Sequence, residues 1–129
     1  MPTSPGAELL ALVTRLADRL RGLPAARLGA LDAPASSAGR AHRLAQRLAD
    51  AEQGTVDRAG DGPPAWRTLP ALGAAVVADQ VAVTGYDAAA ALGRLDPGES
   101  VWTREGRRPA GEVLAELVTE ARQVASGAA

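Results

Sequence analysis

The chain contains no cysteine and no phenylalanine, and it has a single histidine, His42. Without cysteine there is no disulfide, no thiolate metal site and no cysteine nucleophile. One imidazole alone leaves a transition-metal ion short of ligands, so we expect no metal and no cofactor. The only large apolar anchors are Trp66 and Trp102. We expect them to close the two ends of the fold, and Trp102, if exposed, to be a contact residue.

Lysine is also absent, so all 14 basic residues are arginine, and asparagine and isoleucine are missing too. These gaps, beside abundant Ala, Gly, Pro, Leu and Val, are typical of a GC-rich bacterial genome. We therefore do not interpret the arginines as a nucleic-acid signature. The formal net charge of −1 provides no global attraction to nucleic acid or to an anionic membrane, and we expect neither as a partner.

Long apolar runs without charge are lacking as well. The most apolar stretch, residues 69–95, carries Asp79 and Gln80 at its middle and Asp87 beyond them. Ionisable side chains are costly at the centre of a bilayer, so this stretch does not predict a membrane span. Residues 1–6 carry no positively charged side chain of the kind that opens a signal peptide. We expect a cytoplasmic protein.

The 129 residues suffice for one hydrophobic core but not for two, which predicts a single helical domain over residues 1–129. Apolar residues at three- and four-residue steps predict helices near residues 5–21, 36–59, 67–94 and 109–125. Residues 101–108 predict a short loop or hairpin with Gly106 in its turn. The pattern favours an all-α fold, a mostly up-and-down four-helix bundle.

The third predicted helix, residues 67–94, has a side of small residues with a 3.5-residue period: Ala71, Ala75, Ala78, Ala82, Gly85 and Ala89. Such a stripe allows a second helix to approach closely. Two interpretations remain open. The stripe packs against another helix of the same chain, or it packs against a second copy in a homodimer.

Polar side chains interrupt the same predicted helix at Asp79, Gln80, Thr84 and Asp87. Buried polar groups need partners, because leaving them unpaired is costly. One interpretation is an internal hydrogen-bond network. The other is a small polar ligand pocket lined by these four residues.

Charged residues form two rows on the flanking helices, one of Arg40, Arg43 and Arg47, the other of Glu112, Glu116 and Glu120. Such rows are usually solvated, but they can also align neighbouring helices. The order of a winged helix-turn-helix is loosely present too, with a turn at Thr84 and Gly85 and arginines in residues 101–108. The helix between them offers few side chains for base contacts.

Sequence motifs of catalysis are missing: there is no P-loop, no G-x-G-x-x-G and no nucleophile elbow. We therefore expect a non-enzymatic protein that binds itself or another helical protein. The alternatives are a winged-helix-like DNA-binding protein and a bundle with a small polar ligand pocket.

Overall fold

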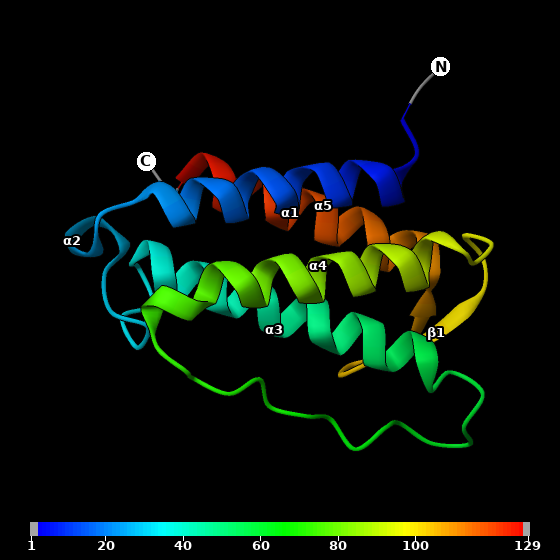
Figure 1. Cartoon of the computed structure of the whole chain (residues 1–129). Coiled ribbons are helices and arrows are strands. Elements are labelled where there is room, and N and C mark those ends of the chain that lie inside the picture. Colours follow the sequence, from blue (N-terminus) through cyan, green and yellow to red (C-terminus); the bar gives the residue numbers. More distant parts are fainter. Residues whose placement is uncertain (1–2, 128–129) are drawn as a thin grey trace.

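The computed structural model describes residues 3–127, and most of them are helical (Figure 1). In chain order the elements are α1 (Pro5–Gly22), α2 (Ala25–Leu28), α3 (Ser37–Val56), the 3-10 turn η1 (Ala74–Val76), α4 (Val77–Gly93), β1 (Ser100–Thr103), β2 (Gly106–Pro109) and α5 (Ala110–Gly127). This mostly helical content, with only one small two-stranded sheet, confirms the expected all-α class. None of the described helices is long and apolar enough to cross a membrane.

A serine side chain caps each of the first two long helices. Ser4 precedes α1 and its hydroxyl oxygen accepts the Ala7 N–H at 3.2 Å, with Pro5 at the first helical position. Ser36 does the same for α3, accepting the Gly39 N–H at 2.9 Å. These side chains satisfy backbone donors that the first helical turn leaves unpaired.

The core lies between α1, α3, α4 and α5, and each of these helices buries an apolar face in it. Its fully buried larger side chains include Leu9, Leu16, Leu44, Leu48, Val77, Val81 and Leu92. Helices α1 and α4 are antiparallel, because Gly6 lies beside Gly93 while Arg21 pairs with Asp79 at the other end.

The prediction of a helix from residue 67 is wrong at its start. Residues 57–73, which we call the strap, form no helix, and α4 begins only at Val77. Proline at position 70 supplies no backbone N–H, and Gly73 adopts a positive φ of 110° that helices do not contain. The backbone of the strap instead bonds to side chains of α3 and α4.

The expected up-and-down order is also wrong at this point. The strap carries the chain back along the whole of α3, so that α3 and α4 start at the same end of the molecule and run parallel (Figure 1). A short turn would have made them antiparallel. The second predicted helix correspondingly ends at Val56, before the expected residue 59.

The predicted hairpin is confirmed. Strands β1 and β2 are antiparallel, Thr103 is opposite Gly106, and Gly106 has a φ of 116°. The hairpin packs on α3 at Gly54, where an added Cβ would come within 1.9 Å of the Trp102 carbonyl oxygen. The turn expected at Thr84 and Gly85 is absent, because both residues lie inside the uninterrupted α4. The helix-turn-helix order is therefore not formed.

Candidate interaction surface

The small-residue stripe is divided between two environments. Its α4 part faces α1 of the same chain: a Cβ on Gly85 would lie 2.5 Å from a methyl group of Val13, and Ala78 and Ala89 are buried. Ala82 is half-buried. Ala71 and Ala75 precede α4, in the strap and in η1, and both are exposed. The close approach that the stripe predicts is thus realised between α1 and α4.

The four polar residues of α4 separate in the same way. Asp79 is exposed and accepts a hydrogen bond from Arg21 at 2.9 Å, and Asp87 is exposed too. Gln80 is buried and donates to the Pro70 carbonyl at 2.8 Å, while the Thr84 hydroxyl donates to the Gln80 carbonyl at 2.6 Å. The structure therefore buries Gln80, half-buries Thr84 and leaves the two aspartates exposed. A ligand-binding role for this set stays a prediction.

The sequence suggested that the two tryptophans close opposite ends of the fold. The structure shows that they do not. Both lie at the C-terminal part of α3, where Trp66 and the Trp102 carbonyl flank Gly54. Each half-buried ring is covered by an arginine, with Arg104 5.4 Å from the Trp66 centroid and Arg107 4.4 Å from that of Trp102. They come together because the strap runs back along α3, which helical periodicity alone did not predict.

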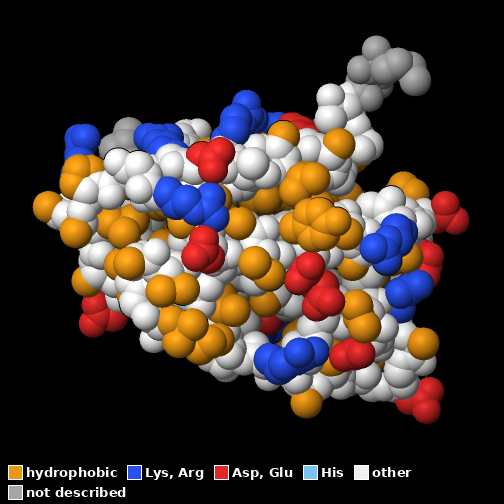
Figure 2. Space-filling model, in the orientation of Figure 1, with side chains coloured by type: hydrophobic (Ala, Val, Ile, Leu, Met, Phe, Trp, Pro, Cys, Tyr) orange, Lys and Arg blue, Asp and Glu red, His pale blue; other side chains and the backbone are white. Residues whose placement is uncertain are grey.

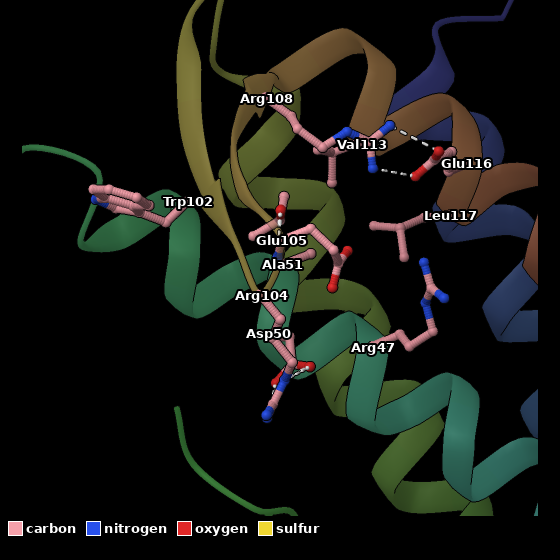
Figure 3. Close-up of a pocket in the computed structure, with 11 residues that line it drawn as sticks. Arg47, Asp50, Ala51, Trp102, Arg104, Glu105, Arg108, Val113, Glu116 and Leu117 are labelled. Carbon is pink, nitrogen blue, oxygen red and sulfur yellow. Dashed lines mark hydrogen bonds and ion pairs between the residues drawn. The ribbon is translucent and has the colours of Figure 1, made fainter. Parts of the chain in front are cut away.

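A cavity of about 130 Å³ lies between α3, the hairpin and α5 (Figure 3). Its arginines are paired with carboxylates of neighbouring elements. Arg104 makes a two-pronged contact to Asp50 at 2.7 and 3.0 Å. Arg108 of β2 bonds Glu112 and Glu116 of α5, the latter at 2.7 Å. The hydroxyl of Thr103 donates to the Gly106 carbonyl within the hairpin.

These pairs also shift the acidities of the groups involved. The Arg108 guanidinium lowers the pKa of Glu116, and both carboxylates raise the pKa of Arg108. Burial raises the pKa of Glu120, against the opposing effect of Arg47 at 3.1 Å. The Arg47–Glu120 pair aligns α3 with α5, as the two charged rows suggested. The ion pairs around this cavity thus hold the hairpin and α5 against α3, and we call this contact region the joint. Its arginine side chains are already paired with carboxylates.

The outward side of α4 carries a different stripe. Asp79, Val83, Tyr86 and Ala90 of α4 and Arg94, the residue directly after it, follow one another at steps of four, three, four and four residues, opposite the core-facing Val81 and Leu92. Val83 and Tyr86 are each 60% exposed. Figure 2 shows this side of the molecule, with apolar side chains gathered over α4 and charged ones beside them. We call these five residues the outward stripe.

The helical spacing of Val83 and Tyr86 in the sequence is the signal that could have revealed the outward stripe. Single exposed apolar side chains are ordinary, but large ones that align along a helix indicate a contact surface. No protein-family model, curated protein or solved structure was found to match the chain significantly.

Proposed function

We propose that this protein is a non-enzymatic self-association module, and that the outward stripe of one copy packs against the outward stripe of another. The observation that carries the proposal is the pair of 60% exposed side chains, Val83 and Tyr86, on a helix that is otherwise well buried on its inner face. Aligned apolar side chains on the surface of a helix are typical of helix–helix contacts between subunits.

The charges of the stripe favour an antiparallel pair of α4 helices. In a dimer with two-fold symmetry, each residue meets the residue equally far from the axis on the other copy. With the axis between residues 86 and 87, Asp79 meets Arg94 at both ends, and Val83 meets Ala90. Opposite charges then flank the centre of the contact, where Tyr86 of one copy meets the exposed Asp87 of the other. A parallel pair would place Asp79 against Asp79 and Arg94 against Arg94, which is repulsive.

The size of the stripe sets the expected affinity. Stable interfaces bury roughly 800 Å² per partner. A stripe of five residues, four of them on a helix of 17 residues, buries less than that. We therefore expect a dimer that dissociates on dilution rather than an obligate one.

The experiment is a measurement of molar mass by light scattering over a range of concentrations. The wild-type protein is expected to rise from 13.1 kDa towards twice that mass as concentration increases. Tyr86→Asp is expected to remain at the monomer mass, because it places two like charges near the dimer axis. Arg94→Glu is expected to weaken the dimer by a smaller factor, since the terminal ion pairs are exposed.

Val56 provides the matched control. It is 61% exposed, as apolar as Val83, and lies at the end of α3 away from the stripe. Val56→Asp is expected to dimerise like the wild type. If Val56→Asp and Tyr86→Asp change the mass equally, or if the wild type is monomeric at every concentration, self-association through the stripe is wrong.

Two further inferences concern the bundle and the cellular setting. We infer that the four long helices act as a single four-helix bundle that holds α4 rigid, supported by the buried core they share. We also infer a bacterial and cytoplasmic setting, supported by the GC-rich amino-acid usage and by the charged residues in every apolar stretch. Another helical protein in place of the second copy is the alternative partner.

A further inference from the structure

The strap lies extended along α3 and is held there through its backbone (Figure 1). The Gln53 side-chain amide donates to the Ala65 carbonyl at 2.7 Å and accepts the Arg67 N–H at 3.1 Å. Two turns earlier on α3, Gln46 donates to the Arg67 carbonyl at 3.0 Å and accepts the Leu69 N–H at 2.7 Å. Each glutamine thus spans a carbonyl and an N–H two residues apart, on one edge of an extended chain.

This arrangement resembles the pairing of a β-strand with its neighbour, with side-chain amides in place of the second strand. Contacts of this kind recognise the backbone of an extended peptide, whatever its side chains. A side-chain anchor adds selectivity: the Trp66 ring lies next to Gly54 of α3 and under the Arg104 guanidinium. The groove is therefore suited to an extended segment with one aromatic side chain.

A third glutamine, Gln80 of α4, makes only the donor half of this contact. Gln80 donates to the Pro70 carbonyl at 2.8 Å, and its side chain is only 9% exposed. Its Oε1 is buried and has no hydrogen-bond partner among residues 3–127. Pro70 is one residue out of register with residues 65, 67 and 69, so Gln80 bonds the other edge of the strap; the same pairing of a carbonyl with the N–H two residues later would give it the N–H of residue 72. The strap instead turns away at Gly73, and the acceptor stays unpaired.

The first residues of the strap are held by the Arg58–Glu99 ion pair and by Arg107, which donates to the Arg58 and Gly60 carbonyls, whereas little of the rest is buried. Most of its side chains are exposed, and Arg58, Pro64, Trp66 and Leu69 are the half-buried ones. Few buried apolar contacts and an exposed backbone are the features of segments that open locally without global unfolding. The groove below it therefore has an occupant that leaves one buried acceptor, the Gln80 Oε1, unsatisfied.

We propose that Gln46, Gln53 and Gln80 form a binding groove for an extended peptide segment of a partner protein, and that the strap is its resident, displaceable occupant. The segment that fits is extended, has backbone N–H groups at the positions of Arg67 and Leu69, carries an aromatic residue at the position of Trp66, and extends two residues beyond Pro70. The groove lies on a surface other than the outward stripe, so this proposal is independent of self-association.

The test uses the full chain with its strap loosened. Arg67→Pro together with Leu69→Pro removes both N–H donors that the glutamines accept, while proline remains compatible with an extended backbone. The probe is a fluorescein-labelled peptide with the sequence of residues 62–73, and binding is followed by fluorescence anisotropy. The loosened protein is expected to bind it at least ten-fold more tightly than the wild type, whose own strap competes intramolecularly.

Gln53→Ala in the loosened protein is expected to weaken peptide binding at least ten-fold, whereas Gln123→Ala, an exposed glutamine of α5, should leave it unchanged. A probe with prolines in place of Arg67 and Leu69 should not bind. The proposal is overturned if the loosened protein, shown to be folded by circular dichroism, does not bind the peptide, or if binding survives the loss of Gln53. Binding of a second copy's strap would appear as competition by unlabelled wild-type protein.

Hydrogen exchange on the wild type tests the same proposal without any variant. The Arg67 and Leu69 amides are expected to exchange at least 100-fold faster than amides in the middle of α3, because the strap opens while the helices stay folded. Equal rates for both sets would mean that the strap leaves only on global unfolding, and would contradict displacement.

Discussion

Two glycines set how closely the elements of this protein approach one another. Gly54 allows the Trp102 carbonyl to rest on α3, and Gly85 allows Val13 of α1 to rest on α4. Glycine normally weakens a helix interior relative to alanine by about 0.5–1 kcal/mol. At these two positions the packing of the neighbour outweighs that preference, because a methyl group has no space.

Gly85→Ala is therefore expected to destabilise the protein by about 1–3 kcal/mol, the usual range for overpacking. Gly22→Ala is the control: Gly22 is also helical, and a Cβ there would meet nothing within 4 Å. It should leave the stability unchanged or raise it slightly. Urea denaturation followed by circular dichroism measures both. A stabilised Gly85→Ala protein would show that α1 and α4 are not packed this closely.

At the scale of elements, the sequence predicts well where local chemistry decides the structure. The serine caps, the α1 stripe and the Gly106 turn follow from short-range rules. The strap does not, because its apolar residues 69–73 and the following turn η1 continue the pattern of α4. Its extended form depends on Gln46 and Gln53, which lie 14 to 23 residues earlier in the chain. Periodicity contains no information on such tertiary contacts.

The outward stripe was hidden for a related reason. Which side of α4 faces solvent depends on where α1 packs, and that is decided by Gly85 and Val13 together. The sequence indicated a contact side of small residues without indicating whether the chain covers that side itself. The structure assigns the small-residue side to α1 and leaves Val83 and Tyr86 outside.

The joint between α3, the hairpin and α5 leads to a prediction about pH. The lowered pKa of Glu116 means that its pair with Arg108 stabilises the fold above the ordinary pKa of 4.5, and that this contribution is lost as the pH falls through the lower pKa of the folded protein. The raised pKa of Glu120 has the opposite sign: its contribution is most favourable at low pH and is lost as the pH rises.

Glu116→Gln is thus expected to lower the free energy of unfolding at pH 7, by less than about 1 kcal/mol because the pair is exposed. The difference from the wild type should shrink towards pH 3. Glu120→Gln should be neutral or slightly stabilising at pH 7. Urea denaturation of the three proteins at pH 7 and pH 3 gives the comparison. The same loss for both variants at pH 7 would contradict the opposite signs.

At the scale of the whole molecule, α4 connects the inside of the protein with its proposed partner. One side of the helix closes the core through Val77, Val81 and Leu92, and the opposite side presents the outward stripe. The Arg21–Asp79 pair joins α1 to one end of that stripe, so the stripe belongs to a fixed surface. A rigid surface loses little entropy on binding, which favours association even when the contact area is small.

The absence of cysteine permits the most direct test of this account. Two single variants, Val83→Cys and Ala90→Cys, are mixed under mild oxidation or with a short bismaleimide and analysed on a non-reducing gel. The antiparallel dimer predicts that the mixture gives a covalent dimer while neither variant does so alone. Efficient cross-linking of Val83→Cys with itself, or no cross-linking in the mixture, would contradict the proposed packing of α4 against α4.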